Sequence, residues 1–219
     1  MSWMDSIWFY PYIITAGIIF TFYIIFIILI IKKYIVINKG LEKKDYLPLI
    51  YGLVFISLLI GRIFSMIFDI TTDYNPANYT EEDYFWWRIG ISFQILAFAL
   101  FFIVLEMRVM KGRDKYIPLI LYFAFYLYGL ITEQVIYIML ALIFAAWIPI
   151  AYLYVAIQSD GNVRKRALLI SFGIIIFMLA AILMSSVVIR ALGMETLQMH
   201  FTANIMKIIA INLLYFGYK

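Results

Sequence analysis

The sequence predicts an all-α, polytopic membrane protein in which residues 1–219 form a single bundle of seven transmembrane helices. Of the 219 residues, 66% are hydrophobic and only 14% are charged, and the mean hydropathy is +0.99. A soluble domain is about half apolar and about a quarter charged, so this chain has too few polar side chains for a water-exposed surface. Two further observations support the prediction: seven long apolar segments, and a one-sided distribution of lysine and arginine.

The seven apolar segments define the expected helices. A spanning helix needs about 20 mainly apolar residues. The expected ranges are 7–31, 47–70, 85–106, 116–131, 135–158, 167–192 and 197–218. The fourth is the shortest, but residues 116–158 are too many for one crossing, and Gly129 with the polar residues 132–134 supplies a turn. Six spans are the alternative count. Pro149, inside the fifth segment, predicts a kink.

Charge predicts how the bundle is oriented. Thirteen of the seventeen basic residues follow the first, third or fifth segment or end the chain: Lys32, Lys33, Lys39, Lys43, Lys44, Arg108, Lys111, Arg113, Lys115, Arg164, Lys165, Arg166 and Lys219. The opposite side is acidic: Asp5, Asp73, Glu81, Glu82, Asp83 and Glu195. The positive-inside rule then places the N-terminus outside and the C-terminus in the cytoplasm, as a multi-pass protein of the cell membrane. An odd number of spans follows. Asn78 begins an N-glycosylation acceptor pattern on the expected outer side.

Polar residues within the spans are the candidate ligand-binding site, because an ionisable side chain in hydrocarbon is costly. The candidates are Arg62, Ser65, Asp69, Arg88, Gln94, Arg190, His200, Asn204 and Lys207. Helical spacing puts Arg62 and Asp69 on one face of the second helix, where they can pair. It also puts His200, Asn204 and Lys207 in one stripe on the last helix. This pattern predicts an outward-facing polar vestibule for an anionic or amphiphilic ligand. Alternatively, the arginines reach the headgroups or pair with carboxylates to hold helices together.

Composition excludes several function classes. The chain has no cysteine and one histidine, which excludes thiol catalysis, iron–sulfur clusters and cysteine-ligated zinc. Ser185 and Ser186 have no motif that would make them nucleophiles with His200, so we expect no enzyme. A nucleic-acid partner is also not expected, whereas membrane lipids are. A transporter or channel is disfavoured because the inner half is poor in polar residues.

The seven-helix plan resembles the sensor region at the front of many archaeal and bacterial histidine kinases. Local similarities are the stretch from Arg62 to Asp69, the Trp87-Arg88-Ile89-Gly90 opening and Glu106 close of the third helix, and the basic turn within residues 152–167. The plan also resembles uncharacterised small membrane proteins of archaea. In the kinases the last helix continues into a signalling domain, whereas this chain ends at Lys219. The resemblance therefore implies a sensor whose output is a separate cytoplasmic protein on the basic loops.

A second resemblance is to microbial rhodopsins, through topology, length and Lys207 in the middle of the last helix. It implies retinal bound to Lys207 as a Schiff base, with a carboxylate counterion in the third helix. That helix offers Glu106, which lies near its cytoplasmic end, and residues 173–181 lack the aromatic and proline pattern of a retinal pocket. Three hypotheses follow: a receptor or sensor, an accessory or structural subunit of a membrane complex, and a retinal protein.

Overall fold

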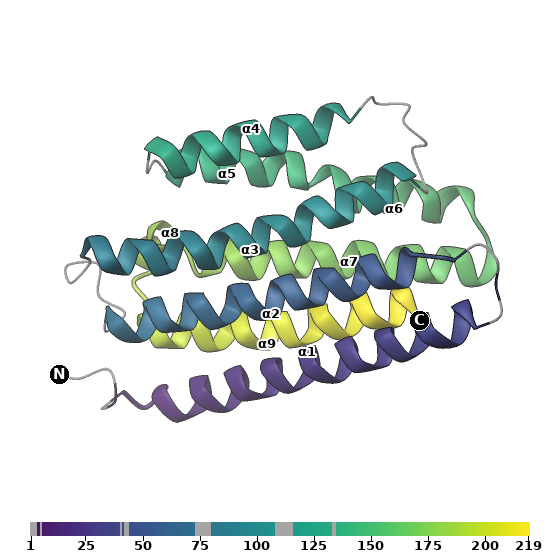
Figure 1. Ribbon diagram of the computed structural model, residues 1–219. Coiled ribbons are helices and arrows are strands. Elements are labelled where there is room, and N and C mark those ends of the chain that lie inside the picture. The colour runs from purple at the N-terminus through teal and green to yellow at the C-terminus, as the bar shows by residue number, and fades with distance from the viewer. Residues whose placement is uncertain are drawn as a thin grey trace.

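Helices that run back and forth along one axis make up the computed structural model (Figure 1). It describes residues 4, 6–39, 41, 44–72, 80–107, 116–132 and 135–219. Over these ranges the helices are α1 (Phe9–Asn38), α2 (Leu47–Thr71), α3 (Glu81–Leu105), α4 (Ile117–Thr132), α5 (Val135–Ala145), α6 (Trp147–Gln158), α7 (Gly161–Leu183), α8 (Ser186–Leu192) and α9 (Thr196–Tyr218). The predicted all-α class is confirmed for this part of the chain, and each of the seven apolar segments is helical.

Within the described part of the chain, six helical stretches are long and apolar enough to cross a membrane. They are α1, α2, α3, the stretch Ile136–Gln158 that joins α5 to α6, α7 and α9. Helix α4 has 16 residues and is shorter than a usual span. Many large apolar side chains are exposed, among them Ile14 at 61% and Ile143 at 64%. Hydrocarbon would cover such a surface and water would not, so the fold suggests a multi-pass membrane protein.

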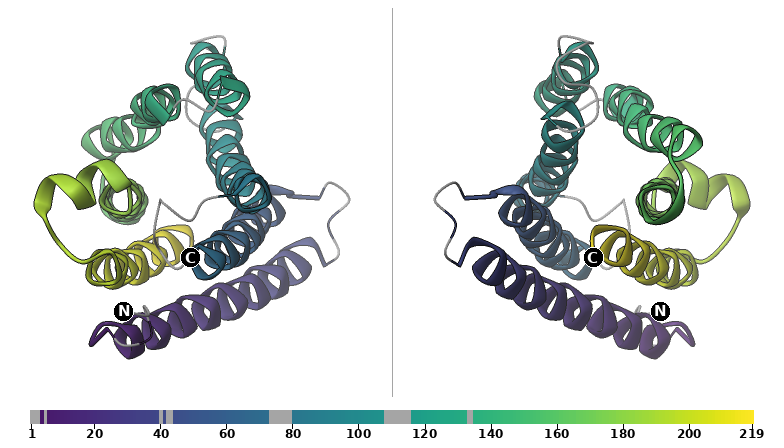
Figure 2. Two further views of the ribbon diagram at one scale, coloured as in Figure 1. Left: turned by 90° about the vertical axis from the view of Figure 1, so that its left-hand side faces the viewer. Right: turned by 90° about the vertical axis from the view of Figure 1, so that its right-hand side faces the viewer.

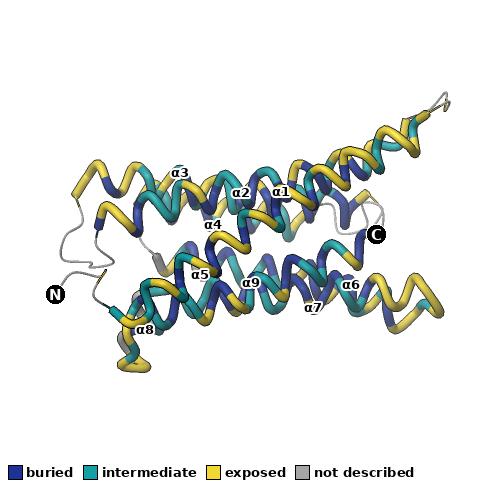
Figure 3. Tube along the Cα trace, turned by 90° about the horizontal axis from the view of Figure 1, so that it is seen from below, coloured by how far each residue is buried: buried dark blue, intermediate teal, exposed yellow. Residues whose placement is uncertain are grey.

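The helices pack in pairs around an apolar core. Helix α2 packs on α3, α7 on α9, α6 on α7, and α4 on α5. Helix α1 lies outside this arrangement and crosses beneath α2 and α9, which are its two main neighbours (Figure 2). Buried positions follow the inward faces of the helices, while the C-terminal end of α1 is largely exposed (Figure 3). Helix α1 is therefore an outer layer held from one side.

Most of the described basic residues lie at one end of the bundle, where Asp45 and Asp160 also lie. At the end where the chain terminates, the described basic residues are Lys32, Lys33, Lys39, Lys44, Arg164, Lys165, Arg166 and Lys219 (Figure 1). We call this the basic end. Glu81, Glu82, Asp83 and Glu195 lie at the opposite end. The predicted segregation is confirmed for these residues, and the orientation in a membrane stays a prediction. Lys43, residues 108–115, Asp5, Asp73 and Asn78 lie outside the described residues.

Helix α1 ends at Asn38 rather than at Ile31 as expected. It continues through Lys33, whose Nζ donates to the backbone oxygens of Tyr218 and Lys219 at 3.3 Å. The same Nζ lies 4.3 Å from the Tyr218 ring centroid. Asn38 caps the end of the helix, because its side-chain amide donates to the last-turn carbonyl of Tyr34 at 2.9 Å, and its Oδ1 accepts from the Asp45 backbone N–H at 2.6 Å. The basic residues expected to flank the helix thus continue it and join it to the C-terminal end of α9.

The kink expected at Pro149 is present as a break between α5 and α6 at Ala146. Proline has no N–H to donate to the carbonyl four residues earlier, which is that of Ala145. Three residues after the break, the Pro149 carbonyl accepts a hydrogen bond from Ser171 Oγ on α7 at 2.9 Å. A buried contact thus joins α6 to α7 beside the break.

A continuous sixth helix over residues 167–192 was expected, and this prediction was wrong. Helix α7 begins earlier, at Gly161, and ends at Leu183, and the separate short helix α8 follows from Ser186. The Ser185 N–H turns back to Ile182 O at 3.0 Å, and its hydroxyl accepts from the Val188 N–H at 3.4 Å. Serine side chains compete with the helical ladder in this way and favour helix starts, so the chain changes direction here.

Helix α3 begins at Glu81, one turn earlier than expected, because Thr80 and Asp83 form a capping box. Thr80 Oγ1 accepts from the Asp83 N–H at 3.3 Å, and Asp83 Oδ2 accepts from the Thr80 N–H at 3.0 Å. The acidic first turn also complements the positive end of the helix dipole. This local signal was readable in the sequence but lay outside the apolar window used to place the helix.

Thr80→Ala is expected to lower the free energy of unfolding by about 1 kcal/mol, because the first-turn amides lose their acceptor. Hydrogen exchange at residues 81–84 should accelerate. Thr202→Ala is the control, since that exposed hydroxyl only bonds back to Gln198 O within its own helix. Unchanged exchange in Thr80→Ala would show that the cap does not hold the start of α3.

Candidate functional site

Arg62 lies at the middle of a buried polar cluster between α1, α2 and α9. Its side chain is 4% exposed. Nη2 donates to Tyr12 Oη at 3.1 Å and to Asn204 Oδ1 at 3.3 Å, and Nη1 lies 3.8 Å from Asp69 Oδ2. We call Tyr12, Thr15, Arg62, Asp69, His200 and Asn204 the polar centre. Arg62 thus contacts side chains from three helices.

Asp69 lies between two groups that can carry positive charge. Its Oδ2 is 3.8 Å from Arg62 Nη1 and 3.6 Å from His200 Nδ1. Two helical turns separate Arg62 from Asp69, so both face α9 from the same side of α2, as predicted. The His200 ring meets the Tyr12 ring edge-on, with centroids 6.1 Å apart. One carboxylate therefore links α2 to α9 on the side of the bundle that α1 covers.

Asn204 and Thr15 complete the connection to α1. The Asn204 amide donates to Thr15 Oγ1 at 3.3 Å, while its carbonyl accepts from Arg62. Thr15 Oγ1 lies 2.9 Å from the backbone oxygens of Pro11 and Tyr12. Sequence reasoning missed Tyr12 and Thr15, whose only signal was that Thr15, like Thr21, is a polar residue in a mainly apolar segment. Through Tyr12 and Thr15, α1 contacts both α2 and α9 and covers the cluster.

Burial distinguishes this arrangement from the expected open vestibule. Asp69 is 9% exposed and His200 5%, and Asn204 is fully enclosed. Helix α1 covers them, because Tyr12 and Thr15 reach across to α2 and α9. The polar centre is therefore mainly interior, and α1 covers one side of it.

Ser65 and Gln94 were predicted as ligand-binding residues, and they lie at a close contact between α2 and α3. Gln94 Nε2 donates to Ser65 Oγ at 3.1 Å, and that hydroxyl donates to Gly61 O at 2.8 Å. A Cβ added to Gly61 would lie only 2.8 Å from Gly90 O. Small residues that let two backbones approach, with a hydrogen bond beside them, are typical of packing between membrane helices.

Lys207 faces α7 rather than the polar centre. Its Nζ lies 2.8 Å from Met184 Sδ and 6.0 Å from the Phe177 ring centroid. Arg62 and Asp69 lie within electrostatic reach, but no carboxylate of the described residues lies within ion-pair distance of Nζ. With 7% exposure, this amine is buried among a thioether and an aromatic ring.

Arg88 stands apart from the cluster. Arg88 is exposed on the second turn of α3. The Arg190 side chain lies outside the described residues. Four of the nine predicted residues lie together in the polar centre: Arg62, Asp69, His200 and Asn204. Ser65 and Gln94 pair at the contact between α2 and α3, and Lys207 faces α7.

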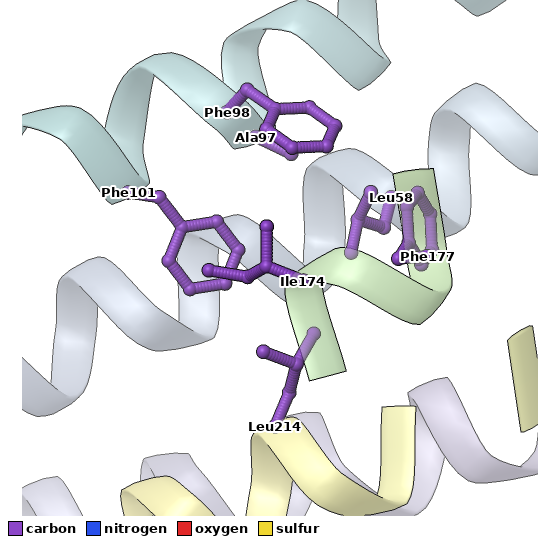
Figure 4. Close-up of a pocket in the computed structure, with 7 residues that line it drawn as sticks. All are labelled: Leu58, Ala97, Phe98, Phe101, Ile174, Phe177 and Leu214. Atoms are coloured by element: carbon purple, nitrogen blue, oxygen red, sulfur yellow. The ribbon is translucent and has the colours of Figure 1, made fainter. Parts of the chain in front are cut away.

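A small cavity lies near the middle of the bundle, beside Phe177 (Figure 4). Its volume is about 10 Å³, and all its lining side chains are apolar: Leu58, Ala97, Phe98, Phe101, Ile174, Phe177 and Leu214. Small-molecule sites usually enclose about 300–1,000 Å³. This cavity is about the size of one water molecule, and Lys207 is not among the residues that line it. Among the described residues, no group of three or more histidine, aspartate or glutamate side chains could hold a metal.

Comparison with known proteins identifies no family. No family model matches the chain, and no curated protein or solved structure matches it. The resemblances to kinase sensor regions and to rhodopsins therefore stay predictions. Function has to be argued from the polar centre and from the helices that it joins.

Lys207→Met is expected to raise the free energy of unfolding by about 2 kcal/mol, since it replaces a costly buried amine by an apolar chain of similar length. Thermal unfolding in lipid nanodiscs measures the effect. Lys32→Met, at an exposed position, should change stability by no more than about 0.5 kcal/mol. A destabilised Lys207→Met protein would mean that the ammonium group makes a stabilising contact in the bundle.

Proposed function

We propose that the chain is a receptor-like, multi-pass membrane protein in which a small anionic or amphiphilic ligand acts on the polar centre. The observation that supports this is the buried Arg62 guanidinium, held by side chains of α1, α2 and α9. An ionised arginine inside hydrocarbon is expensive and marks a functional position by default. An anion would compete with the Asp69 carboxylate for Arg62. The distance of 3.8 Å between Asp69 Oδ2 and Arg62 Nη1 is long for an ion pair, which favours such competition.

Helix α1 provides the route for a response. Near one end of α1, Tyr12 contacts Arg62 within the polar centre. Near the other end, Lys33 contacts the last backbone carbonyls of the chain, after α9, at the basic end. At about 1.5 Å per residue these two contacts lie about 32 Å apart, close to the hydrocarbon thickness of a bilayer. A ligand that favours a displaced α1 would shift the population toward that state and alter the basic end. A separate signalling protein bound there would detect the change.

Native mass spectrometry of the protein released from mild detergent tests the proposal. Wild type should retain a small adduct, and Arg62→Ala should lose it. Arg88→Ala is the matched control, because it removes an exposed arginine from the same half of the bundle. Equal adducts in all three proteins would place the bound molecule elsewhere and overturn the proposal.

An accessory or structural subunit is the second candidate, and one observation favours it. The contacts of the polar centre come from the chain's own Tyr12, Thr15, Asp69 and Asn204, which can serve as attachment between helices without any ligand. The same spectra distinguish it, since a subunit would carry a protein partner and no small adduct. A visible absorbance band after retinal addition, lost in Lys207→Met, would instead support the retinal hypothesis.

A further inference from the structure

A surface groove lies between α7 and α9 at the basic end, away from the polar centre. Its volume is about 330 Å³. We call it the basic groove and define it by Arg164, Lys165, Leu168, Leu169, Phe172 and Leu213. The first five positions named lie on α7, and Leu213 comes from α9. The groove is thus formed by two helices that are both candidate membrane spans.

The groove changes character along its length. Arg164 and Lys165 are exposed in the first turns of α7. The leucines are half-buried, and Phe172 is 50% exposed further along the helix. From Arg164 to Phe172 the helix rises about 12 Å. A cationic rim therefore leads into an apolar floor that runs along the span, where acyl chains would lie in a bilayer.

The surroundings of the rim are mainly positive. Arg166 follows directly on α7 and lies within electrostatic reach of Lys33, which in turn contacts Lys219 O. Two described acidic residues also lie at this end: Asp160, just before α7, and Asp45, which is within electrostatic reach of Tyr218. An excess of cations beside the expected headgroup depth attracts anionic lipids, because each lysine or arginine near the surface adds to the attraction.

We propose that the basic groove binds one anionic phospholipid. Its phosphate lies between Arg164 and Lys165, and one acyl chain covers Leu168, Leu169, Phe172 and Leu213. The charged rim accounts for a preference over zwitterionic lipids. The apolar floor at membrane depth accounts for a lipid rather than a soluble phosphate or a peripheral protein. The site does not depend on the proposed receptor function, because it shares no residue with the polar centre.

Native mass spectrometry with added lipid tests this proposal. Phosphatidylglycerol and phosphatidylcholine with the same acyl chains are titrated separately. Wild type should bind one phosphatidylglycerol in preference to phosphatidylcholine, and Arg164→Ala/Lys165→Ala should weaken phosphatidylglycerol binding by about 30-fold. The control Lys32→Ala/Lys44→Ala removes two exposed lysines from the same end and should leave binding within about threefold. Phe172→Ser should also weaken binding, because it puts a polar group on the floor.

Several results would overturn the proposal. Equal binding of the two lipids to wild type would mean only a non-selective lipid shell. Displacement by inorganic phosphate, with no effect of Phe172→Ser, would indicate an anion site without an acyl-chain contact. Loss of a bound protein in the double variant with lipid binding intact would assign the surface to that protein. If the double variant does not fold, Lys165→Gln replaces it, with a loss of about fivefold expected.

Discussion

Replacing Arg62 by alanine should lower the free energy of unfolding by about 3–5 kcal/mol, the largest effect expected in this protein. The substitution removes the guanidinium that Tyr12 and Asn204 share and leaves the Asp69 carboxylate buried without its arginine. A buried charge that loses its partner keeps its desolvation cost and loses the compensating attraction. Unfolding titrations with SDS in mixed micelles measure the change.

A double-mutant cycle shows whether the loss comes from the pair. Asp69→Ala should also be strongly destabilising, since it removes the carboxylate that lies 3.8 Å from the buried Arg62 guanidinium. The double variant Arg62→Ala/Asp69→Ala should cost less than the sum of the two single changes. Arg88→Ala, at an exposed position, should stay within about 0.5 kcal/mol of wild type. If the two buried substitutions were additive, Arg62 and Asp69 would not be coupled.

Gly61→Ala should destabilise the protein by about 1–3 kcal/mol, although it adds a single methyl group. The new Cβ would lie 2.8 Å from the carbonyl oxygen of Gly90 and 3.0 Å from Gln94 Cγ. Because the closest atom belongs to the backbone of α3, the two helices have to separate. The adjacent hydrogen bond from Gln94 to Ser65 would weaken with them.

Gly17→Ala is the matched control for Gly61→Ala. Gly17 also lies within a long helix, but a Cβ there would meet nothing within 4 Å. Alanine should therefore be neutral or stabilise by up to about 1 kcal/mol, through its better helix propensity. Thermal unfolding of both variants in the same nanodiscs gives the comparison. Equal stability of the two variants would contradict the close packing of α2 on α3.

The sequence carried much of the fold because hydrophobic length is a local signal. All seven apolar segments became helices, and the kink near Pro149 was located within three residues of the break at Ala146. Spacing along a single helix was equally informative. It correctly put Arg62 and Asp69 on one face of α2 and put His200 and Asn204 together on α9.

The partners of the polar side chains could not be predicted in the same way, because they depend on which face each helix turns toward its neighbours. The sequence of a uniformly apolar segment does not show that face. Helices that are apolar all round have little amphipathicity, so the inward face of α1 could not be identified and the roles of Tyr12 and Thr15 were missed. Lys207 lies in the same stripe of α9 as Asn204, yet its side chain contacts Met184 at the end of α7. Ser65 and Gln94 looked like site residues, whereas the glycines beside them make their position a helix crossing.

The most direct test of the account is the distance between α1 and α9 with and without Arg62. Because the chain has no cysteine, Ile14→Cys/Thr202→Cys gives one spin-label pair at two exposed positions. Double electron–electron resonance in nanodiscs should show one narrow distance distribution in the otherwise wild-type protein. Adding Arg62→Met should broaden it or create a second, longer population, while Arg88→Met should not. An unchanged narrow distribution with Arg62→Met would contradict the claim that the polar centre holds α1 on the bundle.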